Sequence, residues 1–285
     1  MVKSQKKPPK GKAASSKPTA KGMYSSVIER VFAAKFKPGA KHADFSRDDI
    51  EAAAETLDVD PKNVGDLVYT YRYRRALPDS IRSKAPSNHV WIIRGVGAAQ
   101  YRFAAVSEDY AFIRPRQGLA EIRVPDATPG VIAKYALDDE QALLAKLRYN
   151  RLIDIFMGVT CYSLQSHLRT QVEDIGQVET DEIYVGIDKQ GAHYVFPVQA
   201  KGGTDQHSIV QIEQDFGLCR EKFPTAICRA IAAQFVDTEK IALFAFDVAK
   251  GNEAVILTEK HYRLVAPEDI TEDELKAYRK ESLKG

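Results

Sequence analysis

The sequence is poor in the features that define several large classes of protein. Its three cysteines, Cys161, Cys219 and Cys228, form no Cys-x-x-Cys pair and no Cys/His cluster. This spacing argues against structural zinc and is typical of reduced, buried thiols. No apolar run is long enough to span a membrane, and no internal repeat is visible. We therefore expect a cytoplasmic protein without a membrane partner.

Acidic residues are absent from residues 1–22, which contain seven lysines separated by prolines and small residues. Such a segment cannot bury a core, and it has no apolar stretch of the kind found in secretory signals. We expect residues 1–22 to be a disordered basic tail that either aids solubility or binds nucleic-acid phosphates. The rest of the chain has more acidic than basic residues, so any other nucleic-acid surface must be a local patch.

A basic patch of this kind lies between Tyr69 and Arg102, where Asp79 is the single acid. Apolar residues at helical spacing predict one helix after Ser46 and a second one that ends near Tyr73. The run that starts at His89 predicts a β-hairpin that turns at residues 95–97.

Two helices followed by a hairpin resemble a winged helix-turn-helix domain, which we assign to residues 23–106. The resemblance implies that the second helix enters the major groove of double-stranded DNA. The predicted DNA contacts are Arg72, Tyr73, Arg74, Arg75 and Arg94. The alternatives are a solvated basic face or a surface that binds protein; a cluster of arginines favours phosphate binding.

Acidic, amide and lysine side chains mark two predicted strands that flank a turn at residues 189–191. Glu179 and Asp181 share one face of the first strand, and Gln199 and Lys201 share one face of the second. A hairpin would bring them together at one end of a sheet. Oxygen ligands suit Mg²⁺, and a lysine beside the metal can orient water or stabilise negative charge. The pattern predicts metal-assisted hydrolysis of phosphodiesters.

Asp181 followed by Gln199-x-Lys201 on the next strand resembles the PD-(D/E)XK nuclease superfamily, in the QxK form found in Mrr-type restriction nucleases. The resemblance covers roughly the second half of the chain. It implies that Asp181 binds Mg²⁺ with help from Gln199 and Glu179, that Lys201 is the catalytic lysine, and that Mn²⁺ substitutes. Gln199 departs from the pattern, because most members carry an acid there, which leaves the metal with one fewer negative ligand.

The remaining elements complete an α/β catalytic domain at residues 138–285, which a connector at residues 107–137 joins to the N-terminal domain. We expect a restriction endonuclease-like fold with a central mixed β-sheet flanked by helices. One long helix is predicted at residues 138–158, a strand follows it, and a further helix is predicted at residues 228–235. Gln165 on that strand and His207 after Lys201 are placed close to the DNA.

The sequence thus predicts a Mg²⁺-dependent endodeoxyribonuclease that acts on double-stranded DNA, of restriction type and dimeric as such enzymes usually are. Two alternatives remain open. One is a Holliday-junction or repair nuclease on the same fold. The other is a non-catalytic DNA-binding regulator whose Gln199-x-Lys201 site has decayed.

Overall fold

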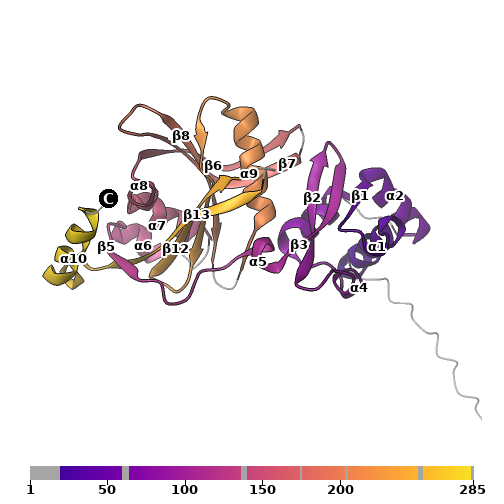
Figure 1. The fold of residues 1–285 in the computed structure, drawn as a ribbon, viewed down its shortest axis with the longest axis horizontal. Coiled ribbons are helices and arrows are strands. Elements are labelled where there is room, and N and C mark those ends of the chain that lie inside the picture. Colours follow the sequence, from indigo (N-terminus) through magenta and orange to yellow (C-terminus); the bar gives the residue numbers. More distant parts are fainter. Residues whose placement is uncertain are drawn as a thin grey trace, which may run out of the picture.

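The computed structural model describes residues 20–59, 64–135, 140–173, 175–202, 205–249 and 253–283. Most of the predicted basic tail therefore lies outside the described residues. The described chain forms a small N-terminal unit and a larger unit built around an eight-stranded sheet (Figure 1). No helix in this described part has the length and apolar character needed to cross a membrane.

The N-terminal unit packs helices against a three-stranded antiparallel sheet in the order β1-β3-β2. Ser46 starts its second helix, because its hydroxyl accepts the Asp49 N–H while the Asp49 carboxylate accepts the Ser46 N–H. The two predicted helices and the predicted hairpin are all present in this unit. The elements are α1 (Ala20–Lys35), β1 (His42–Ser46), α2 (Arg47–Thr56), α3 (Val64–Tyr69), a π-helix (Thr70–Arg74), α4 (Asp79–Arg82), β2 (His89–Gly97) and β3 (Gln100–Ser107).

The larger unit contains the mixed sheet in the order β5-β13-β12-β11-β8-β7-β6, with β10 also beside β8. Strand β11 is parallel to β8 and β5 is parallel to β13, and the other pairs along this order are antiparallel. Its first elements are α5 (Glu108–Ala111), β4 (Phe112–Ile113), β5 (Glu121–Pro125), α6 (Gly130–Tyr135), α7 (Glu140–Tyr149), α8 (Leu152–Met157) and β6 (Thr160–Val172). The hairpin and its surroundings are β7 (Gly176–Ile187), β8 (His193–Lys201), β9 (His207–Ser208), α9 (Ile209–Lys222), β10 (Ile227–Cys228) and β11 (Ile231–Phe235). The chain continues through β12 (Lys240–Val248), β13 (Ala254–Val265), a 3₁₀ turn (Pro267–Asp269) and α10 (Glu272–Ser282).

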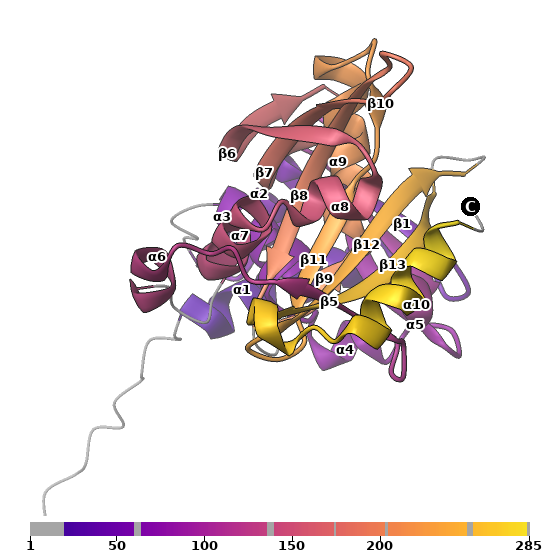
Figure 2. The same cartoon turned by 90° about the vertical axis from the view of Figure 1, so that its left-hand side faces the viewer.

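Helices cover both faces of the large sheet, as the sequence predicted (Figure 2). On one face, α7 and α8 bury Leu143, Leu147 and Leu152 against Phe196 of β8 and its neighbours. On the other face, α9 packs Ile212 and other apolar residues against the sheet. The central mixed sheet flanked by helices is therefore confirmed.

Two element predictions in the larger unit are wrong. The single helix expected at residues 138–158 is broken between α7 and α8 at Arg151, which has a left-handed backbone with φ of 50°. The helix expected at residues 228–235 is instead the short strands β10 and β11, and every residue of β11 is buried. A short, wholly buried apolar run has the same composition in a strand and in a helix, so its spacing misled the prediction.

The N-terminal unit is docked onto the larger one through its hairpin. Ile92 of β2 and Ala104 of β3 join the apolar cluster that surrounds α9. A Cβ placed on Gly95 would lie 2.0 Å from the backbone oxygen of Ile175, so only glycine permits this approach of two backbones. Gly95 therefore lies within β2, and the hairpin turns at residues 98–99 instead of the predicted 95–97.

Candidate functional site

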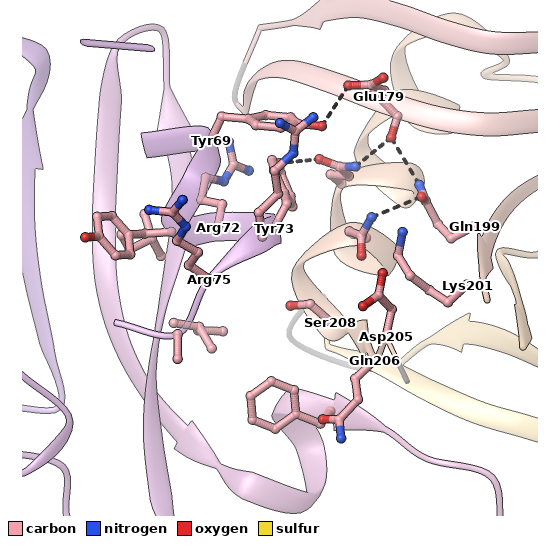
Figure 3. A pocket seen from close by; sticks show the side chains of 18 of the residues that line it. Tyr69, Arg72, Tyr73, Arg75, Glu179, Gln199, Lys201, Asp205, Gln206 and Ser208 are labelled. Carbon is pink, nitrogen blue, oxygen red and sulfur yellow. Dashed lines mark hydrogen bonds between the residues drawn. The ribbon is translucent and has the colours of Figure 1, made fainter. Parts of the chain in front are cut away.

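A cavity of about 710 Å³ lies between the two units and contains most of the predicted site residues. One wall comes from the segment 69–77 of the N-terminal unit, and the opposite wall comes from β7, β8 and the start of α9. In Figure 3, Tyr69, Arg72 and Tyr73 lie on one side, and Gln199 and Lys201 lie on the other. The structure thus brings together two groups of residues that the sequence placed in separate domains.

Asp181 lies at the point where β7 separates from β8. The two strands are paired from Glu182 onward, whereas β7 remains paired with β6 in the preceding segment. Oδ2 of Asp181 accepts a hydrogen bond of 2.8 Å from the backbone N–H of Ala200, in place of a ladder partner. Burial raises the pKa of Asp181 above its usual value, against the opposing effects of the Ala200 N–H and the Lys201 ammonium.

Lys201 ends β8 and forms an ion pair with the first residue of α7. Its Nζ donates to Oε1 of Glu140 at 2.5 Å, and only 16% of the lysine side chain is exposed. Glu140 lines the same cavity as Asp181, and its carboxylate also acts to raise the pKa of that aspartate. Sequence reasoning did not select Glu140, because no spacing rule aligns a helix acid with residues 41 and 61 positions further along the chain. Asp181, Glu140 and Lys201 converge at this end of the sheet.

Gln199 is fully buried, and both the nitrogen and the oxygen of its side-chain amide form hydrogen bonds. Its Nε2 donates to the Glu179 carbonyl oxygen at 3.1 Å and to Oδ2 of Asp215 at 2.9 Å, and its Oε1 accepts from Gln211 at 3.2 Å. These bonds join β7, β8 and α9. The amide of Gln199 thus ties two strands to a helix, and its oxygen, the atom predicted to ligate the metal, already accepts one hydrogen bond.

Asp215 of α9 is the buried acid behind Gln199, and no sequence pattern marks it as part of the site. Its Oδ1 accepts from the Thr180 hydroxyl at 2.6 Å, while the Gln199 amide donates to its other oxygen. Burial raises the pKa of Asp215 to about 8, and the nearby Asp181 carboxylate acts in the same direction. The acid therefore holds a proton at neutral pH.

Glu179, the other predicted metal ligand, lines the cavity and contacts the N-terminal unit. Its Oε2 accepts from the Tyr69 hydroxyl at 3.0 Å and from Arg169 at 2.9 Å. The carboxylate is thus a docking contact for the N-terminal unit. A second such contact joins the Tyr73 hydroxyl to Oε1 of Gln214 at 2.6 Å.

Three predicted DNA contacts lie elsewhere than expected. Arg94 forms a two-bond ion pair with Glu213 of α9 at 2.7 and 2.5 Å, so its charge is engaged in joining the two units. His207 is completely buried, its Nε2 is bonded to the Ala233 carbonyl oxygen at 2.9 Å, and burial lowers its pKa to about 3. It cannot reach DNA, and that prediction is wrong. Gln165 is exposed on β6 and is not one of the residues that line the cavity.

The remaining predicted contacts, Arg72, Tyr73, Arg74 and Arg75, all line the cavity. Arg74 and Arg75 are exposed, whereas Arg72 is buried against the ring of Tyr73. The basic patch therefore faces the acidic edge of the sheet across the cavity and not open solvent alone.

The oxygen atoms that could bind the predicted magnesium ion belong to the carboxylates that line the cavity. Within the described residues, no group of three or more His, Cys, Asp or Glu side chains is placed to hold a metal. Mg²⁺, however, is commonly held by one or two carboxylates, with water and substrate phosphate as its other ligands. Asp181 and Glu140 supply two such carboxylates beside Lys201. The residues present fit Mg²⁺, because Asp181 and Glu140 line the same cavity beside Lys201.

Comparison with known protein families finds no family model that matches this sequence, and no curated protein matches it either.

Proposed function

We propose that this protein is a magnesium-dependent endodeoxyribonuclease, with a PD-(D/E)XK-type catalytic unit and a winged-helix-like N-terminal unit. The observation that carries the proposal is the convergence of Asp181, Glu140 and Lys201 at the end of β7 and β8. Two carboxylates and an ammonium at one edge of a sheet suit the hydrolysis of a phosphodiester.

The order of elements supports the catalytic part of the proposal. Helices α7 and α8 precede the antiparallel strands β6, β7 and β8, and α9 then leads to β11, which is parallel to β8. A helix before the catalytic hairpin and another after the lysine are what the resemblance to the superfamily implies. In the N-terminal unit, the order is α1-β1-α2-α3, then the π-helix and α4, then β2-β3, and this order with a β1-β3-β2 sheet supports a winged helix.

The chemistry follows from the residues at this edge. Asp181 and Glu140 would hold Mg²⁺, which when bound supplies Lewis-acid activation of a phosphate oxygen and of water. Lys201 is positioned by Glu140, and its ammonium stabilises negative charge that develops on the phosphoryl oxygens. Because burial raises the pKa of Asp181, a cation beside it favours its ionised form and so couples proton release to metal binding.

The test is cleavage of supercoiled, linear and branched DNA, each with and without Mg²⁺ or Mn²⁺. Lys201→Ala and Glu140→Gln are expected to slow cleavage about 100-fold or more, with little effect on DNA binding. Lys189→Ala is the matched control, because this exposed lysine lies in the turn at the other end of the same hairpin. Unchanged cleavage by pure Lys201→Ala protein would contradict the assignment of the lysine.

The type of DNA that is cleaved distinguishes the candidate functions. Preferential cleavage of linear duplex supports a restriction-type enzyme, for which we propose a homodimer with two active sites. Preferential cleavage of branched DNA supports a repair nuclease. DNA binding without cleavage in either metal would overturn the nuclease proposal in favour of a regulator.

A further inference from the structure

Arg72 is the most unusual residue in the cavity wall. It is 8% exposed, and its Nε is buried without a hydrogen-bond partner among the described residues. Its guanidinium lies 4.9 Å from the centre of the Tyr73 ring, and no ion pair to Arg72 is found in the part of the chain that the structure describes. A buried cation without an anionic partner is unfavourable, so the position calls for an anion from outside.

The surroundings of Arg72 indicate which anion this is. Arg74 and Arg75 line the same cavity, and neither has a carboxylate partner within the described ranges. The planar fork of arginine matches phosphate, and three guanidiniums in one wall exceed what a single carboxylate ligand requires. The opposite wall carries Lys201. The cavity thus has a phosphate-binding wall that faces the proposed reaction site.

Aromatic and apolar groups lie between the arginines. Tyr69, Tyr73 and Phe112 are partly exposed and line the same cavity, and the guanidiniums of Arg74 and Arg72 lie over the rings of Tyr69 and Tyr73. Arginines interleaved with aromatic rings are the usual surface for unpaired nucleotides, because a base stacks on a ring or guanidinium while its phosphate binds the cation.

The size of the cavity selects one strand and not two. Its volume of about 710 Å³ lies in the range of pockets that enclose a single small ligand. The walls are joined by the contacts Tyr69–Glu179, Tyr73–Gln214 and Arg94–Glu213. A continuous duplex, whose major groove alone is about 12 Å wide, would have to separate them.

We infer that this cavity binds an unpaired DNA nucleotide, with a phosphate on Arg72 and the base against the aromatic wall, so that the strand to be cut enters the site as a single strand. This inference rests on the proposed nuclease function and narrows its substrate. The unpaired nucleotide comes either from single-stranded DNA or from a nucleotide extruded from a duplex, and both present the same phosphate and exposed base.

The experiment measures binding without metal, so that it is independent of cleavage. Fluorescence anisotropy compares full-length protein on a labelled single strand, on its perfect duplex, and on a duplex with one bulged nucleotide. We expect the single strand and the bulged duplex to bind about tenfold or more tightly than the perfect duplex. Equal affinity for all three DNA molecules would overturn the inference. A preference for the bulge over the single strand identifies extrusion as the source, and the reverse identifies single-stranded DNA.

Arg72→Met tests the anion site directly. This substitution is expected to weaken single-strand binding about tenfold and to raise the thermal unfolding midpoint of the free protein, because it removes an unpaired buried charge at similar volume. Arg72→Lys should recover part of the binding. Arg30→Met, at an exposed position on α1, should change neither quantity. Unaltered binding by Arg72→Met protein with an intact fold would overturn the inference.

Two further probes define the ligand. Inorganic phosphate should compete weakly with the single strand, and dAMP should compete better. A dAMP affinity equal to that of the oligonucleotide would overturn the assignment of the ligand as a DNA strand. Failure of cleavage with the single-strand preference intact would count against the nuclease function, whereas cleavage with no such preference would count only against this inference.

Discussion

Asp215 leads to a prediction about how the stability of the protein depends on pH. The acid is fully buried on α9, and burial raises its pKa from 3.8 to about 8 in the folded protein. Between these two values the folded state holds a proton that the unfolded chain has released. The free energy of unfolding that depends on this proton is therefore fully present below about pH 4 and is lost as the pH rises towards 8.

The expected size follows from one bound proton. Over the range in which only the folded state is protonated, stability falls by about 1.4 kcal/mol for each pH unit, or roughly 3 kcal/mol from pH 5 to pH 7. Asp215→Asn removes this contribution, because asparagine has the shape of the protonated acid and does not titrate. Asp181, whose pKa is also raised, contributes in the same direction but is present in both proteins.

The measurement is urea unfolding of both proteins at pH 5, 6, 7 and 8, with linear extrapolation to water. The stability of Asp215→Asn relative to the unsubstituted protein should rise steadily with pH. Asp58→Asn, at an exposed turn position with φ of 50° that asparagine tolerates, is the control and should show a constant difference. A constant difference for Asp215→Asn as well would refute the reasoning about its burial and proton.

Two further predictions concern the same structural connections. Gln199→Glu places a second carboxylate against Asp215. The substitution should lower the free energy of unfolding by about 1–3 kcal/mol at pH 8 and by less at pH 5, because protonation relieves the repulsion. Unfolding curves equal to those of the unsubstituted protein at both pH values would contradict the Gln199–Asp215 contact. Gly95→Ala forces the β2 backbone away from Ile175, so it should lower the free energy of unfolding by about 1–3 kcal/mol and increase proteolysis between the units. The control Gly130→Ala, whose added Cβ meets no atom within 4 Å, should have neither effect. Similar proteolysis of the two variants would argue against this close approach.

The hairpin of the candidate site was predictable because its signals are local. Alternating side chains define β7 and β8, and Gly191 occupies a left-handed turn position with φ of 82° between them. Face alternation also placed Asp181 near Lys201 correctly. The same rule places Glu179 in this cavity, but its partners Tyr69 and Arg169 depend on docking and on the neighbouring strand, which no local pattern indicates.

The errors arose where distant parts of the chain decide the outcome. The sequence around Arg94 suggests a basic residue that is available to bind DNA, but its ion-pair partner Glu213 is 119 positions away. Gly95 reads as a turn residue, but its lack of a side chain serves an approach to Ile175 in another unit. Arg72 was assigned to DNA from its neighbours in the sequence, and nothing there indicated that it would be buried opposite Lys201. Docking of the two units is a tertiary property that periodicity does not encode.

The neutral residue at position 199 also has a different meaning in the folded protein. The sequence suggests a catalytic edge that has lost an acid, whereas the structure places the carboxyl group of Asp215 directly behind Gln199. At neutral pH this group is protonated, so it adds no charge next to Asp181. As the pH rises through 8, the Asp215 carboxyl group ionises. Its negative charge then makes the ionised form of Asp181 less favourable unless a cation is bound nearby. The affinity of the proposed site for Mg²⁺ should therefore increase with pH more steeply than the ionisation of Asp181 alone would produce, and Asp215→Asn should remove that extra dependence.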